Sequence, residues 1–220
     1  MKAEVAGYFF KQHTGYPGIK KVDAPSAFLL DTKMKTYSRI IIAFCALCMI
    51  GAYFFPLWLI TLDAPQYPEG LTMNLWIDKL AGDINTINGL NHYIGMKHMS
   101  TEEFPEFGYM KYIVGALIIF GLITSIANNK KIFFIFTCSF LLIGVIGVYD
   151  FWKWEYDYGH VLSPTAAIKV PGMSYQPPLL GYKDLLNFTA GSFPDIGGYA
   201  VIIPACISFA VFILEWFFLK

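Results

Sequence analysis

The chain has 220 residues, of which 56% are hydrophobic and 18% aromatic, while only 15% are charged and the formal net charge is zero. Charged residues make up about a quarter of ordinary soluble domains, so this composition argues against a soluble globular protein and indicates an integral membrane protein. The neutral balance and the absence of long basic runs argue against nucleic-acid binding.

Residues 1–39 form a basic tail with seven Lys or Arg residues against three acidic ones. The early apolar stretch at residues 7–10 is too short for the core of a secretory signal, so we expect no cleaved signal. An uncharged run of 23 residues follows at 40–62 and predicts the first transmembrane helix. Aromatic residues near its end are typical of a membrane interface.

Residues 63–108 are polar and rich in turn-forming residues, which predicts a first long loop outside the membrane. Within this loop, residues 75–80 have the pattern of a short amphipathic helix that lies against the membrane surface. The second span is predicted at 109–127, with Lys111 reaching the headgroups, and the third at 132–149. A polar cytoplasmic turn at 128–131 separates these two spans.

Residues 150–195 are predicted to form a second long loop, which opens with an aromatic run and continues through an extended, proline-rich segment at 163–178. The fourth span is predicted at 196–219, with Glu215 at the membrane interface. The expected fold class is therefore an all-α membrane protein with four transmembrane helices. Its two long extracytoplasmic loops are expected to pack into a small cap with at most a short sheet.

The distribution of positive charge predicts the orientation of the chain. The tail, the turn at 128–131 and Lys220 hold ten Lys and Arg residues, whereas the two long loops hold five. Both termini are therefore expected in the cytoplasm of a multi-pass protein of the inner (plasma) membrane. An even number of spans puts both loops on the same outer side, where their residues could meet.

The strongest chemical signal is the segment 88–99, which carries two histidines and two methionines. In a helix, His92, Met96 and Met99 would share one face, and in a strand His92, Met96 and His98 would point the same way. Imidazole and thioether are neutral donors that suit Cu(I) better than harder ions do. With His160 and Met173 from the second loop, the candidate metal ligands are His92, Met96, His98, Met99, His160 and Met173.

Two structural alternatives stand beside the copper hypothesis. The methionines could simply fill apolar gaps, while the histidines form hydrogen bonds or lie at the surface.

All four cysteines lie within apolar runs, which argues against a disulfide framework. Cys45 and Cys48 form a C-x-x-C pattern inside the first span, where close helix packing is the simpler explanation.

Several sections of the sequence resemble a known family. They are FPLWLITLDAPQYPEG at 55–70, NGLNHYIGM at 88–96, YDYGH at 156–160 and IKVPGMSYQPP at 168–178. They resemble the NosB-like small polytopic membrane proteins encoded beside nitrous oxide reductase and its copper-maturation genes in clade II clusters. The resemblance covers about half the chain and excludes the first 35 or so residues. It implies a role in assembling, supplying copper to, or delivering electrons to a periplasmic copper enzyme, and it provides no catalytic residues.

The function expected from these observations is that of an accessory protein that handles copper or supports the maturation of a periplasmic copper enzyme. The alternative is a structural or electron-transfer partner subunit without a metal site of its own. Either function implies a periplasmic or membrane protein partner, besides the lipid bilayer. A transporter is less favoured because the spans carry no charge at mid-depth. We do not expect an enzyme, because the chain lacks phosphate-loop, H-E-x-x-H and G-x-S-x-G motifs.

Overall fold

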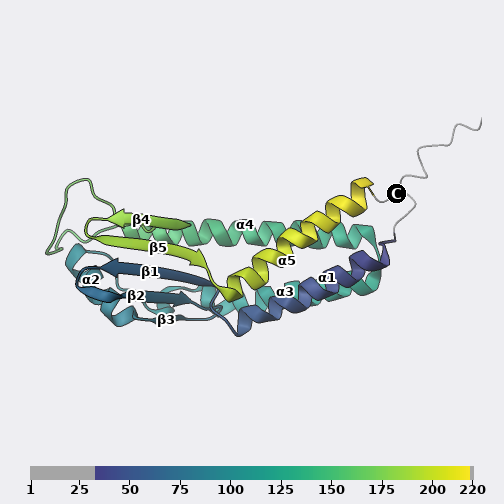
Figure 1. Cartoon of the computed structure of the whole chain (residues 1–220), viewed down its shortest axis with the longest axis horizontal. Helices are drawn as coiled ribbons and strands as arrows, with labels where there is room; N and C mark the ends of the chain where they lie inside the picture. Colours follow the sequence, from purple (N-terminus) through teal and green to yellow (C-terminus); the bar gives the residue numbers. More distant parts are fainter. Residues whose placement is uncertain (1–32, 219–220) are drawn as a thin grey trace, which may run out of the picture.

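The computed structural model describes residues 33–218, which form a helical bundle at one end of a long molecule and a β-sheet at the other (Figure 1). The expected all-α fold class is wrong. Of the described residues, 58% are helical and 17% lie in strands, so the fold is mixed α/β. The predictions for residues 1–32 of the basic tail and for Lys220 fall outside the described residues.

Within residues 33–218, four helices are long and apolar enough to cross a membrane. They are α1 (Thr36–Cys48) with its 3-10 continuation (Met49–Tyr53), α3 (Glu106–Ala127), α4 (Lys130–His160), and α5 (Ile196–Ile213) with its π-helical end (Leu214–Phe218). Ile42, Met49, Phe133 and Phe136 form the buried centre between them. Both ends of the described chain lie at the end of the bundle that is remote from the sheet (Figure 1).

Helix α4 is longer than a membrane requires. Its 31 residues span about 46 Å, whereas about 20 residues cross the hydrocarbon core. The last residues of α4, 150–160, lie against the sheet instead, where the ring of Phe151 approaches that of Trp58 with 5.2 Å between centroids. The aromatic run that opens the expected second loop is thus helical, because its apolar side chains recur at helical spacing and find an apolar sheet to cover.

The sheet has five antiparallel strands in the order β3-β2-β1-β5-β4. Strands β1 (Trp58–Ala64), β2 (Tyr67–Leu75) and β3 (Leu80–Gly82) precede α3, and β4 (Gly181–Leu185) and β5 (Phe188–Pro194) follow α4. Segments far apart in the sequence therefore join at the β1–β5 pair. Between β3 and α3 lie α2 (Ile84–Ile94) and a short 3-10 helix (Thr101–Glu103).

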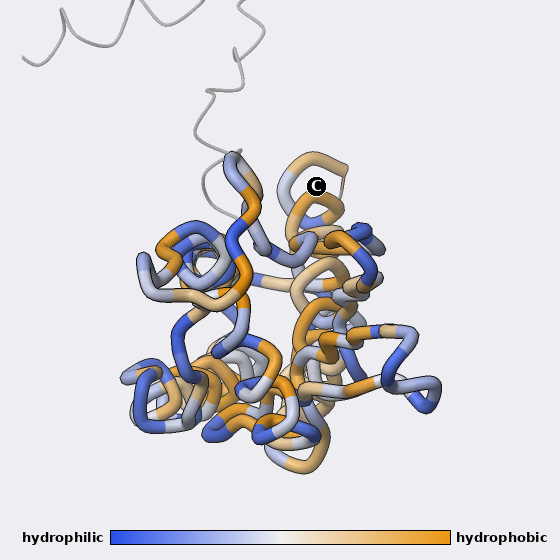
Figure 2. The backbone as a smooth tube through the Cα atoms, turned by 90° about the vertical axis from the view of Figure 1, so that its left-hand side faces the viewer, coloured by the Kyte–Doolittle hydropathy of each residue, from blue (hydrophilic) through white to orange (hydrophobic). Residues whose placement is uncertain are grey.

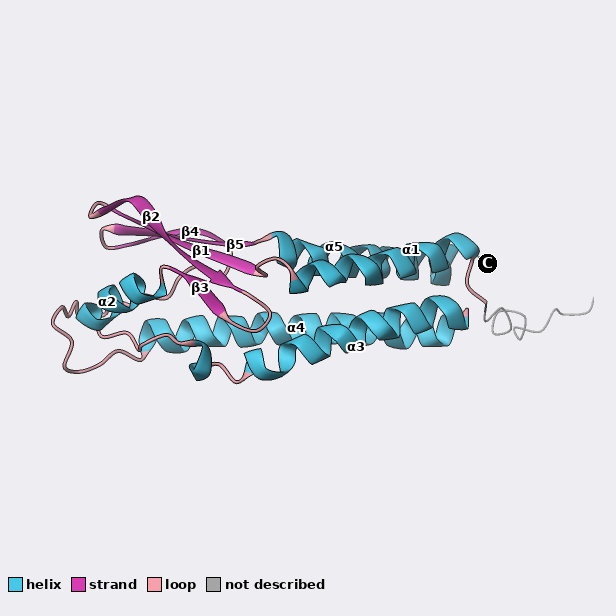
Figure 3. Cartoon of the chain, turned by 90° about the horizontal axis from the view of Figure 1, so that it is seen from below, coloured by secondary structure: helices cyan, strands magenta, loops and turns pink. Residues whose placement is uncertain are grey.

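One face of the sheet covers α2 and the end of α4 (Figure 3). Ile60, Leu71 and Met73 are buried there with Ile87 of α2 and Tyr158 of α4. Seen from the sheet end, the nearest segments carry both hydrophilic and hydrophobic residues (Figure 2). We call β1–β5, α2 and residues 150–160 of α4, with the segments that connect them, the sheet domain.

Two local expectations differ from the structure. The apolar run at 40–62 is divided, because helical structure ends at Tyr53, before Pro56, and the rest of the run enters the central strand β1. The prediction of an amphipathic helix at 75–80 is wrong. Residues 75–80 instead join β2 to β3, and the N–H of Trp76 donates to the carbonyl oxygen of Lys79 at 2.8 Å.

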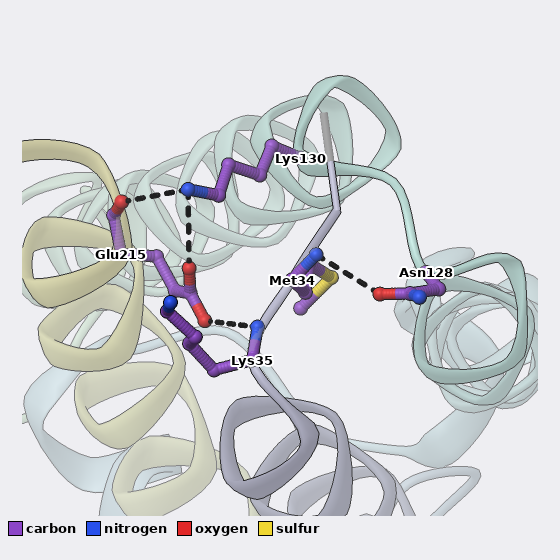
Figure 4. A network of polar contacts seen from close by, with 5 residues as sticks. All are labelled: Met34, Lys35, Asn128, Lys130 and Glu215. Atoms are coloured by element: carbon purple, nitrogen blue, oxygen red, sulfur yellow. Dashed lines mark hydrogen bonds and ion pairs between the residues drawn. The ribbon is translucent and has the colours of Figure 1, made fainter. Parts of the chain in front are cut away.

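Polar contacts tie three segments together at the end of the bundle remote from the sheet (Figure 4). Glu215 is buried, with 2% of its surface exposed, although it was expected at the interface. It accepts a hydrogen bond from the N–H of Lys35 at 2.7 Å, and Lys130 Nζ lies 3.5 Å from its carboxylate. The N–H of Met34 donates to the side chain of Asn128 at 2.9 Å. The start of α1 is thereby held to the α3–α4 turn and to the end of α5.

Candidate functional site

A small cavity lies inside the sheet domain, between the covered face of the sheet, helix α2 and the end of α4. Its volume is about 70 Å³, and its walls are largely apolar. Ile60 and Met73 contribute from the sheet, Asn91 from α2, and Trp154 and Glu155 from α4. We call it the methionine cavity, because three of its lining residues are methionines: Met73, Met96 and Met99.

The three methionines reach the cavity from different segments. Met73 lies opposite Ile60 in the β1–β2 pair and points inward, with 3% of its surface exposed. Met99 is 4% exposed, and Met96 packs, partly buried, against the same apolar cluster. Strand pairing fixes Met73, whereas Met96 and Met99 lie in the segment that follows α2.

Asn88 holds the segment that carries Met99. The side chain of this buried α2 residue donates to the carbonyl oxygen of Met99 and accepts from its N–H, each at 2.7 Å. The same amide nitrogen lies 3.1 Å from Nε2 of His98. Helix α2 ends at Ile94, and the next residue, Gly95, adopts a left-handed conformation (φ 81°), so the chain turns back there and returns alongside the helix.

The structure brings together only part of the predicted ligand set. Met96 and Met99 line the cavity, but His92, His98 and His160 are exposed, and Met173 is half-buried in the segment after α4. His160 stacks on the ring of Tyr156, with 4.0 Å between centroids. The predicted helical face of His92, Met96 and Met99 does not form, because α2 ends at Ile94. Within residues 33–218, no group of three or more His, Cys, Asp or Glu residues is placed to hold a metal ion.

Glu155 is the acidic residue of the cavity, and it was not among the predicted site residues. Its side chain is 0% exposed, and neither carboxyl oxygen has a hydrogen-bond partner in the described part of the chain. Burial raises the pKa of this carboxyl from 4.5 to about 8, and the nearby positive charge of Lys183 opposes the shift. The sequence alone does not single out Glu155 or Met73, because Glu155 lies in an aromatic run and Met73 lies in an alternating strand pattern.

Three further lining residues carry polar atoms without a partner. The side-chain nitrogen atoms of Asn91 and Trp154 and the hydroxyl group of Tyr175 are buried, and none is hydrogen-bonded within residues 33–218. Buried polar groups are usually paired, so four such residues around one small cavity are unusual. The cavity thus combines soft sulfur donors with polar groups that lack partners.

The segment 174–178 closes one side of the cavity, to which Tyr175 and Pro177 contribute. It crosses α4 at Gly159, whose carbonyl oxygen accepts from the N–H of Tyr175 at 2.9 Å. A Cβ atom at Gly159 would lie 2.3 Å from the backbone nitrogen of Gln176, so only glycine allows this close approach.

A second, more open cavity of about 250 Å³ adjoins the first, and Trp154 lines both. Four acidic residues line it together with one lysine, Lys153. The acidic residues are Glu103, Glu106, Asp150 and Asp157. Their combined charge favours cations over anions at this position.

The donor set fits a soft monovalent metal ion better than a hard divalent one. Three thioethers are neutral, polarizable donors, whereas Mg²⁺ and Ca²⁺ require several oxygen ligands. Among the residues that line the methionine cavity, Glu155 supplies the carboxylate. Comparisons of this chain with protein families, with curated proteins and with solved structures found no match.

Proposed function

We propose that the chain is a membrane-anchored accessory protein that holds monovalent copper in the methionine cavity and supports copper handling for a periplasmic copper enzyme. The observation that carries this proposal is that Met73, Met96 and Met99 line one small cavity with largely apolar walls. Thioether sulfur binds Cu(I) without requiring deprotonation, and an apolar surrounding limits the access of water to the ion. Cu(I) would be the cargo of this protein, which would bind the ion and later release it.

The proposed orientation puts the sheet domain outside the cytoplasm. Both α1 and α4 begin at the end of the bundle that is remote from the sheet, and five positive residues lie at or next to these two helix starts: Lys33, Lys35, Arg39, Lys130 and Lys131. Positive residues favour the cytoplasmic side, so both termini would be cytoplasmic and the cavity would face the periplasm. The protein would then be a multi-pass protein of the inner membrane, and its partner would be a periplasmic or membrane-bound copper protein.

The acidic cavity supports the same function. Glu103 and Asp150 are two of its four acidic residues, and Trp154 lines both this cavity and the methionine cavity. A concave surface with one sign of charge raises the local concentration of cations. The resemblance of residues 55–70, 88–96 and 156–178 to NosB-like proteins supports a partner in the nitrous oxide reductase system.

Competition with a Cu(I) chelator tests the proposal on the purified full-length protein. We expect the wild type to retain about one Cu(I) ion per chain. The triple variant Met73→Leu, Met96→Leu and Met99→Leu keeps the apolar volume and should lose this ion. His92→Gln is the matched control, because His92 is exposed and does not line the cavity, so its retention should equal that of the wild type.

Two outcomes would contradict the proposal. The wild type could hold no Cu(I), or the triple variant could retain it as tightly as the wild type does. The methionines would then serve packing alone, and the alternative of a structural or electron-transfer partner subunit without a metal site would be the better account.

A further inference from the structure

The packing of the sheet domain does not explain why a carboxyl group is buried at Glu155. It is 0% exposed, it lines the methionine cavity, and both of its oxygen atoms lack hydrogen-bond partners within residues 33–218. An unpaired buried polar group lowers the stability of the folded state. A leucine at this position would avoid this cost, so the carboxyl points to a function rather than to folding.

We propose that Glu155 supplies the negative charge that holds a monovalent metal cation in the methionine cavity. This inference rests on the proposed function and adds a residue to it. Thioethers are neutral, so three of them around a monovalent ion leave its full positive charge among largely apolar walls. Burying an unpaired charge is strongly unfavourable, and an adjacent carboxylate offsets this cost.

No other lining residue can provide that charge. Apart from Glu155, the residues around the cavity are apolar or neutral, and the polar ones are Asn91, Trp154 and two tyrosines. Asn91 and Trp154 are neutral side chains, so neither can offset the positive charge of a bound cation. Glu155 is therefore the lining residue that can provide a negative charge, and it does so by releasing its proton when the cation binds.

The nearest positive side chain does not satisfy the carboxyl. Lys183 of β4 is close enough to influence Glu155, but its Nζ donates to the carbonyl oxygen of Gln176 at 3.0 Å. Ordered water is the competing explanation, since about 70 Å³ corresponds to the liquid volume of about two water molecules. Water, however, would give no reason for three thioethers in the same wall.

The test compares cation affinity in charge-removing variants of the full-length protein. Cu(I) and Ag(I) are each titrated against a competing chelator, and Ag(I) serves as a soft monovalent probe that does not change oxidation state. Glu155→Gln keeps the shape of the side chain and removes its charge. Glu155→Leu is the second variant, in case the glutamine variant folds poorly. Asp78→Asn is the control, because it removes an exposed carboxylate from the β2–β3 turn of the same domain.

We expect both Glu155 variants to bind both ions at least about tenfold more weakly than the wild type, because removing one partner of a buried charge pair is costly. The Asp78→Asn variant should bind like the wild type. The melting temperature without metal should not fall in Glu155→Leu, which separates loss of binding from loss of folding.

The outcomes distinguish this inference from the function on which it rests. If the wild type binds Cu(I) and either folded Glu155 variant binds it equally tightly, the role of Glu155 is contradicted while the copper function stands. If the wild type binds neither ion, the proposed function fails and the inference fails with it.

Discussion

The buried side chain of Asn88 has a clear consequence at the scale of single residues. Its amide makes both backbone hydrogen bonds of Met99, so it determines where the segment after α2 runs. Asn88→Ala leaves the buried N–H and carbonyl groups of Met99 without partners. We expect the free energy of unfolding to fall by about 1–3 kcal/mol. The affinity for Cu(I) should also fall, because Met99 is no longer held in position.

Thermal unfolding in detergent measures this loss, with Asn85→Ala as control. Asn85 lies on the same helix but is exposed, so its replacement should leave the melting temperature within about one degree of the wild-type value. Equal melting temperatures for the two variants would show that the Asn88 hydrogen bonds do not hold the segment.

Glu155 predicts how the stability of the metal-free protein depends on pH. Its pKa is raised by burial from 4.5 in the unfolded chain to about 8 in the folded one, against the opposing charge of Lys183. The folded state therefore keeps a proton that the unfolded state releases. The resulting stabilisation is complete below pH 4.5 and is lost as the pH rises toward about 8, with a slope of up to about 1.4 kcal/mol per pH unit.

Chemical unfolding of the wild type and of Glu155→Gln between pH 5 and about 8 measures this slope. As the pH rises over that range, the free energy of unfolding of the wild type should fall steadily relative to that of Glu155→Gln. A constant difference would mean that the Glu155 carboxyl does not titrate as its burial implies.

At the scale of elements, the close crossing of α4 by the segment 174–178 is the most sensitive contact of the cavity wall. Gly159→Ala would put a Cβ atom 2.3 Å from Gln176, so the segment must move. We expect faster proteolysis within residues 163–178 and a lower melting temperature. Gly147→Ala, on the same helix with nothing within 4 Å of the added atom, is the matched control and should behave like the wild type.

The elements also show how far sequence reasoning reaches. Long uncharged runs predict apolar helices, since few other structures bury so many apolar residues in succession, and the four long helices α1, α3, α4 and α5 lie over such runs. The same logic fails at β1, because a central strand covered on one face is as apolar as a span. The sequence of residues 58–62 therefore predicts the end of a transmembrane helix, although these residues lie in β1.

The candidate site was predictable only in part, and the reason is physical. Met96 and Met99 are close in the sequence, so their meeting in one cavity follows from a local turn at Gly95. Met73 and Glu155 join them through strand pairing and through the packing of α4 on the sheet, which no local pattern encodes. The histidines of the same segment are exposed, His92 on α2 itself and His98 in the segment that follows it.

At the scale of the whole molecule, the orientation in the membrane decides where the cavity can exchange its ligand. We predict that reporter fusions at Ser100 and Thr165 report the outer side and that a fusion at Asn129 reports the cytoplasm. Asn129 lies in the turn between α3 and α4, at the end remote from the sheet, whereas Ser100 and Thr165 belong to the sheet end. An outer location for Asn129 would reverse the proposed topology.

X-ray absorption at the copper edge, on the full-length protein loaded with Cu(I), identifies the atoms that bind the ion. We predict scattering dominated by sulfur from Met73, Met96 and Met99, which decreases stepwise as these residues are replaced by leucine and is unchanged in His92→Gln. A spectrum dominated by nitrogen, or one that the three leucine substitutions leave unaltered, would show that copper binds elsewhere and that the methionine cavity is not its site.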